Sequence, residues 1–438
     1  MRSGLLAILA IMALSVASFG ETPPAQAPPA PAPLPPAILS LQGALAVASQ
    51  QVSALQQAQI DEQIAAQDLL QAKAGLLPRV RDFFTIMYNS PFSGTDQQSF
   101  IAQNAVHEYQ NLIGVAGDWN FGLISAISRS RALLEAARAG TEVARHALVR
   151  GVDEAYYGAA LATAKRTAAE QSLAAAEEFE HITALNEHAG EVPEVDVIRA
   201  RLQTAARRDD LAQARQAETI ANAALWTLLG YGITKSPVIE PLPQTIDVRQ
   251  IDRFTAARVP HRPEFAQLEA QVRAAHADVR VARADLLPAI SYSVDEGFDT
   301  PSLAPAELRK HQGILATANV DVPIFDWGVT WSRIRQAQLR ARGAELQREL
   351  IIRDLYLQFA TARQEALTAA DRVENARLAV ADAERNVSIS VARYRAGEGS
   401  IVEATDALTT LATERLALQQ SLFDYQVAVA RLREAAGE

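Results

Sequence analysis

Cysteine is absent from the 438 residues, so the chain can form no disulfide, no thiolate metal site and no cysteine nucleophile, and it has no cysteine for N-terminal lipid attachment. Aromatic residues make up only 6 % of the chain, whereas alanine, leucine, glutamine, glutamate and arginine are abundant, a composition typical of long helices. The formal net charge of −10 leaves no basic stripe to neutralise phosphates, which argues against a nucleic-acid partner.

Motifs for catalysis are missing as well. The turn Gly397-Glu398-Gly399 lacks the lysine and the preceding strand that a phosphate-binding loop needs. The seven histidines are scattered, and only His181 and His188 could share a helical face, so metal binding is a minor alternative to surface positions. No serine or carboxylate pair stands in a recognisable catalytic frame. We therefore predict a protein that is not an enzyme and that holds no cofactor and no metal.

An apolar run at the start of the chain predicts export. It ends at Ser18-Phe19-Gly20, which fits the small-residue pattern for cleavage after Gly20. We predict a signal peptide at 1–20, with an N-terminal anchor as the alternative, because a spanning helix needs about 20 apolar residues. Residues 21–37 are rich in proline and alanine and are interpreted as a semi-extended linker. No other segment is apolar for long enough to span as a helix, so a membrane location would require strands.

The remaining chain shows one unit repeated, in the order helix, strand, strand, long helix, turn, helix. Leu-Leu-Pro precedes an alternating segment at Pro78 and at Pro288, 210 residues later, and a glycine turn recurs at Gly190 and Gly397, 207 residues apart. We predict a first repeat over 38–230, with strands at about 79–92 and 113–124 and a hairpin tip near 190. An equatorial connector at 231–263 and a second repeat over 264–438 follow, with strands at about 289–298 and 314–325 and a tip near 397–400.

The predicted helices are unusually long. The pattern from about 128 to 188 covers roughly 60 residues, on the order of 90 Å, whereas helices in globular proteins average about 11–12 residues. After the second turn an a/d seam is interrupted only at Arg415. Its apolar members are Leu408, Leu411, Leu418, Leu422, Tyr425, Val429 and Leu432. Such a seam is typical of coiled-coil or tunnel packing.

Four strands cannot close a sheet, and open strand edges are not tolerated in lipid. Three copies of the chain would contribute twelve strands, with an apolar face toward lipid and a polar face toward a wet lumen. The candidates for an interfacial aromatic belt are Trp119, Tyr292, Phe325, Trp327 and Trp331. The alternative is a soluble α+β domain in which these aromatics form a core.

Three motifs in fixed order resemble the TolC family of outer-membrane efflux channels. They are Leu-Leu-Pro followed by a strand, VDVPIFDWG before a long helix, and YRAGEGSIVEATDAL at the second turn. The resemblance covers the chain after the linker and implies a mostly α fold with a small membrane β-barrel. In that family a homotrimer forms a twelve-stranded barrel in the Gram-negative outer membrane, continued by an α-helical coiled-coil tunnel through the periplasm.

The resemblance also implies a function. The expected role is the exit duct of a tripartite efflux or type I secretion system, working with a periplasmic adaptor and an inner-membrane transporter. The alternative is a soluble periplasmic coiled-coil adaptor or structural protein. The sequence does not identify the cargo, which could be drugs, metals, metabolites or proteins.

The family's site residues can be placed on matching positions. Glu403 and Asp406 match an acidic ring at the periplasmic gate, although Ser400-x-x-Glu403 also reads as a capping box. Asp196 and Tyr394 match a latch between the hairpins at the entrance, and Gly399 replaces a basic residue that commonly joins it. The expected adaptor-docking tips are Gly190, Glu191, Gly397, Glu398, Gly399 and Ser400, where glycine could also serve only to end a helix.

Overall fold

The computed structural model describes residues 38–91, 104–231 and 238–438. The predicted signal peptide and linker lie outside the described residues. So does the last position of the strand predicted at 79–92, together with residues 232–237 of the predicted connector.

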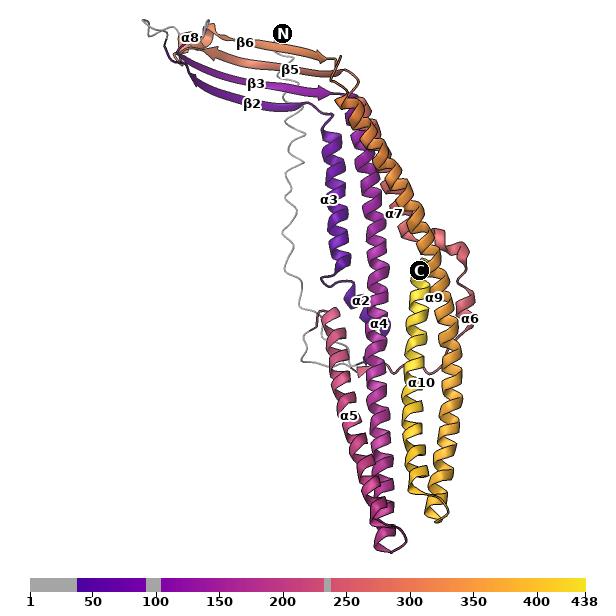
Figure 1. Ribbon diagram of the computed structural model, residues 1–438. Helices are drawn as coiled ribbons and strands as arrows, with labels where there is room; N and C mark the ends of the chain where they lie inside the picture. The colour runs from indigo at the N-terminus through magenta and orange to yellow at the C-terminus, as the bar shows by residue number, and fades with distance from the viewer. Residues whose placement is uncertain (1–37, 92–103, 232–237) are drawn as a thin grey trace.

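The molecule is elongated, with a sheet at one end and two helical hairpin tips at the other (Figure 1). The first half contains α3 (Ala54–Ala74), β2 (Arg79–Tyr88), β3 (His107–Trp119), α4 (Phe121–His188) and α5 (Glu194–Leu228). The second half contains α7 (Pro263–Ala284), β5 (Ala289–Thr300), β6 (Gln312–Asp321), α9 (Val329–Arg395) and α10 (Ile401–Ala435). The predicted duplicated helix-strand-strand-helix-helix unit is confirmed.

Short elements complete the chain. They are β1 (Ile38–Leu39), α2 (Leu41–Ala48), β4 (Val238–Ile239), α6 (Arg249–Asp252), the 3₁₀ helix η1 (Ala256–His261) and α8 (Pro305–Lys310). Strand β1 pairs in parallel with β4, which joins the start of the first half to the segment between the halves.

Helices α4 and α9 are 68 and 67 residues long and contain no proline, so nothing interrupts their hydrogen bonding over about 100 Å. The second strand of the first half was predicted at 113–124, and this was wrong at both ends, because β3 spans His107–Trp119. Helix α4 begins earlier than predicted because the Asn120 side chain accepts a hydrogen bond from the Leu123 N–H (3.1 Å). In the described ranges, no helix is both long enough and apolar enough to cross a membrane.

The sheet has the strand order β2-β3-β5-β6, and every pair in it is antiparallel. Strand β6 ends at Asp321, earlier than the predicted 325, because the segment that follows contains Pro323, which cannot donate a ladder hydrogen bond. Strands β2 and β6 are the two edges of the sheet, so each presents one unpaired side.

The largest apolar core lies at mid-length, where α9, α10 and α4 meet the segment between the halves. Its fully buried members include Ile251, Val259, Val373, Leu422 and Leu432. The predicted a/d seam of α10 therefore faces the protein interior here. The interruption at Arg415 is accommodated because its guanidinium reaches Glu384 of α9 (2.8 Å).

Candidate functional site

The two hairpin tips share one backbone geometry. At the end of α4, Gly190 has φ +76° and its N–H donates to the Glu187 carbonyl (2.8 Å), while the Glu191 N–H donates to the Asn186 carbonyl (2.9 Å). This pattern is a Schellman motif, which requires a left-handed residue and so favours glycine.

The end of α9 repeats this motif. Gly397 has φ +74° and donates to the Tyr394 carbonyl (3.1 Å), and the Glu398 N–H donates to the Arg393 carbonyl (2.9 Å). Helix termination thus accounts for the glycine at both turns, independently of any docking role.

Gly399 is glycine for a different reason. Its φ is not left-handed, but a Cβ there would lie 3.1 Å from the Arg393 Cβ and 3.2 Å from the Tyr394 nitrogen. The Gly399 N–H also donates to the Arg393 carbonyl (3.1 Å). The end of α9 therefore leaves little room for a side chain at the position where a basic latch residue was expected.

The capping box predicted at Ser400 and Glu403 is only half formed. The Ser400 Oγ accepts a hydrogen bond from the Glu403 N–H (3.3 Å), as a helix cap should. The Glu403 carboxylate instead accepts from the Arg393 guanidinium (3.3 Å), which also donates to the Glu398 carbonyl (3.3 Å). A charged donor across the turn attracts this carboxylate more strongly than a backbone N–H does. The second gate candidate, Asp406, lies one turn further along α10 and is exposed.

Tyr394 is buried between the hairpins and feels the charge of Asp196 on α5, but no hydrogen bond joins the two side chains in the described part of the chain. Tyr394 is only 4 % exposed and packs against Phe179 of α4, with ring centroids 5.3 Å apart. Burial raises the pKa of the Tyr394 hydroxyl, and the negative charge of Asp196 adds to the increase. The apolar cluster around Tyr394 consists of Phe179, Ala200, Ile401 and Ala404, with Val192, Val391 and Leu408 at its margin.

Other contacts join the two hairpins near their tips. Arg395 of α9 pairs with Glu178 of α4 (3.6 Å), and Gln203 of α5 donates to Thr409 of α10 (2.8 Å). Neither contact was predicted, because the partners lie about 200 residues apart and on different helices. The apolar packing around Tyr394 and these two polar contacts therefore hold the hairpins together.

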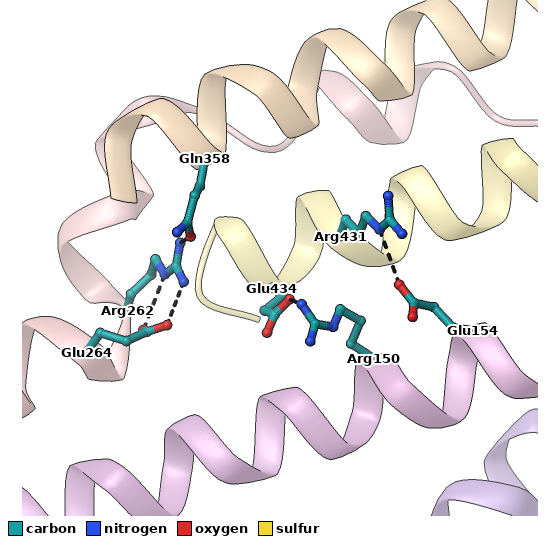
Figure 2. A network of polar contacts seen from close by, with 7 residues as sticks. All are labelled: Arg150, Glu154, Arg262, Glu264, Gln358, Arg431 and Glu434. Carbon is teal, nitrogen blue, oxygen red and sulfur yellow. Dashed lines mark hydrogen bonds and ion pairs between the residues drawn. The ribbon is translucent and has the colours of Figure 1, made fainter. Parts of the chain in front are cut away.

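A second set of polar contacts joins α4 to the end of α10, as Figure 2 shows. Arg150 pairs with Glu434 (3.1 Å), and Arg431 pairs with Glu154 (3.2 Å), so each helix supplies one acid and one base. Nearby, the guanidinium of Arg262 pairs with Glu264 (2.5 Å) and donates to Gln358 (3.3 Å). This network, which the sequence did not predict, fixes the register between the two halves at mid-length.

All five candidates for the aromatic belt are exposed in the isolated chain. Trp119 stacks edge-on against Phe121 (4.8 Å), and Phe325 stacks against Trp327 (4.9 Å) at the helix-facing end of the sheet. The ring of Tyr292 lies over Gly117 of the neighbouring strand. The alternative in which these aromatics form a soluble core is therefore wrong.

The model of the outer membrane efflux protein family matches residues 259–438. Pyoverdine export outer membrane protein OpmQ of Pseudomonas aeruginosa is 26 % identical over 403 residues, covering 88 % of this chain and 80 % of that protein.

Two solved structures show the same fold. A structure of CusC matches with TM-score 0.81 and 20 % identity, covering 91 % of this chain and 92 % of that chain. The outer membrane protein VceC of Vibrio cholerae matches with TM-score 0.79 and 19 % identity, covering 91 % and 96 %.

Proposed function

We propose that this chain, which belongs to the outer membrane efflux protein family, is the outer-membrane exit channel of a tripartite efflux or secretion system in a Gram-negative bacterium. The observation that carries the proposal is the fold itself, in which one four-stranded sheet continues into helices of 68 and 67 residues. The likeness to CusC extends over 91 % of the chain. A periplasmic adaptor is disfavoured, since the relatives found are outer-membrane channels.

The sheet edges support a trimer. The unpaired side of β6 in one copy can pair with the unpaired side of β2 in the next, and three copies close a sheet of twelve strands. A head-to-tail contact of this kind forms a ring when the rotation closes, and the closed sheet leaves no free edge.

Exposed apolar side chains on the helices at the two flanks support the same assembly. Helix α5 exposes Val195, Ile198, Leu202 and Ile220. Helix α9 exposes Leu339, Leu346, Leu350, Leu357, Leu378 and Ile389. At the hairpin end, α5 and α9 lie on opposite sides of the molecule (Figure 1), so in a ring Leu378 and Ile389 of α9 would meet α5 of the next copy. The sheet-end half of α9, with Leu339, Leu346 and Leu350, would instead meet α3 of the next copy. Burying these rows against a neighbour would remove them from water.

The hairpin tips would form the periplasmic entrance. Glu403 and Asp406 would line it as a cation-attracting gate, and Asp196 and Tyr394 would take part in a latch that holds the hairpins closed. The turns at Gly190 and Gly397 would receive the periplasmic adaptor, through which the inner-membrane transporter delivers its cargo. OpmQ is named for pyoverdine export, and the cargo of this chain is left open.

Reconstitution tests the proposal. The purified protein should be trimeric in detergent by light scattering and should form ion-conducting channels in planar bilayers. Leu350→Asp should lower the trimeric fraction, because it places a charge in the apolar row of α9, whereas the volume-conserving Leu350→Met should not. A monomeric, water-soluble protein without conductance would refute the channel.

A further inference from the structure

The two faces of the sheet differ in polarity, although the mostly apolar face also carries the carboxylates of Asp82 and Glu296. Residues directly opposite one another in the register share a face, and one face is mostly apolar, with Val80, Phe84, Val115, Tyr292, Val294, Ile314 and Val320. The opposite, polar face carries two arginines, Arg79 and Arg81, and the carboxylates of Glu108, Asp118, Asp295, Asp299 and Asp321. The polar face of each chain therefore has an excess of negative charge.

Asp295 is held in place on that face by a glycine of the neighbouring strand. It stands directly opposite Gly114, and its carboxylate occupies the space that a Cβ on Gly114 would fill. Asp295 is only 6 % exposed, although it lies in the middle of β5. The carboxylate therefore lies against the backbone of β3.

Two other carboxylates of the polar face have side-chain partners. Asp118 pairs with Arg79 (4.0 Å), and Asp299 accepts a hydrogen bond from Gln110 (3.3 Å). Within the described part of the chain, the Asp295 carboxylate has neither a hydrogen bond nor an ion pair. The Asp295 oxygens are not among the buried atoms that lack a partner, so they reach the solvent on this face, where a charge that no neighbouring side chain neutralises attracts cations.

We propose that Asp295 selects cations at the sheet end of the channel, and that its ligands are inorganic cations and cationic solutes passing through the lumen. The proposal rests on the proposed function, because it needs the polar face to line a closed sheet. Three copies would present three Asp295 carboxylates at one depth, far from the hairpin tips. Selectivity would then have a second determinant, at the opposite end of the molecule from Glu403 and Asp406 (Figure 1).

Reversal potentials in a KCl gradient test the proposal. Asp295→Asn keeps the side-chain shape and should lower the cation-to-anion permeability ratio by roughly two-fold or more. The matched control is Asp82→Asn, because Asp82 lies on the apolar face, where its carboxylate accepts from Asn111 (2.8 Å). This control should leave the ratio unchanged, and Asp295→Glu should restore it.

The side of the membrane from which a cationic blocker is added distinguishes the Asp295 site from the hairpin tips. Hexamminecobalt(III) added at the sheet side should block wild-type channels more strongly than Asp295→Asn channels, whereas Asp406→Asn should weaken block from the hairpin side. An unchanged permeability ratio and unchanged sheet-side block in Asp295→Asn would overturn the inference while the channel itself stands. A wild-type protein that forms no channel would instead refute the proposed function.

Discussion

Replacing Asp153 by asparagine should stabilise the protein at neutral pH. Asp153 lies on α4 within the mid-length core and is only 5 % exposed, and its Oδ1 has no hydrogen-bond partner among the described residues. Burial raises the pKa of its carboxyl above the usual 3.8, with Arg433 opposing this effect and Glu154 adding to it. Asp153→Asn removes the buried charge but keeps a polar amide at the same place, and because Arg433 already offsets part of the cost of that charge, we expect a gain of about 1 kcal/mol at most.

The pH dependence of the free energy of unfolding shows independently that the Asp153 charge destabilises the folded protein. Because the pKa of Asp153 is raised in the folded state, the folded protein binds more protons than the unfolded chain as the pH passes above 3.8. The stability of the wild type should therefore fall as the pH rises through this window, and the full cost should be present above the raised pKa. Asp153→Asn should lack this contribution, so the gap between the two proteins should widen with pH and then level off.

Denaturant unfolding in detergent from pH 4 to pH 8 measures both effects. The control is Glu384→Gln on α9, which removes a half-exposed acid that is paired with Arg415 (2.8 Å) and does not act on Asp153. It should lose about 0–1 kcal/mol, the opposite sign to Asp153→Asn. If Asp153→Asn is less stable than the wild type at pH 7, or if the two differ equally at all pH values, the reasoning from burial is wrong.

Three further predictions concern the core and the tips. Leu432→Ala, at a fully buried site, should cost about 2–5 kcal/mol in denaturant unfolding, and a cost under about 1 kcal/mol would contradict its core position. Gly397→Ala should cost about 1 kcal/mol or more, because φ is +74°, and should speed proteolysis at the second tip. Asp406→Asn should weaken cation selectivity more than Glu403→Gln, because Glu403 is paired with Arg393 (3.3 Å), and Arg393→Gln should strengthen it. Equal effects of the two acid substitutions in bilayer reversal potentials would show that the pair does not neutralise Glu403.

The sequence predicts what depends on local pattern. The Leu-Leu-Pro repeats place the starts of β2 and β5, because proline cannot continue an α-helix beyond its first turn. Gly190 and Gly397 mark the hairpin turns, because a left-handed residue is needed whatever lies around it. The start of α4 was misplaced because Asn120 gives only a short capping signal next to a strand-like alternation.

Contacts between distant segments could not be predicted in the same way. Arg393 meets Glu403 only because the turn brings two helices side by side, and Phe179 meets Tyr394 across about 200 residues of chain. The confinement of Asp295 depends on a register that puts Gly114 opposite it, and a shift by one residue would move it to the other face. Residue type and spacing carry none of this information.

The two hairpin turns share a backbone geometry but carry different side chains. Adding 207 to Gly190 gives Gly397, and the hydrogen bonds at the two turns are the same. The side chains that follow are not the same, since Arg199 occupies in the first hairpin the position that Asp406 occupies in the second. In a three-fold assembly, a partner that recognises the turn backbone would find six near-equivalent places, whereas one that recognises these side chains would find three. The stoichiometry of a docked complex would therefore report which kind of recognition the partner uses.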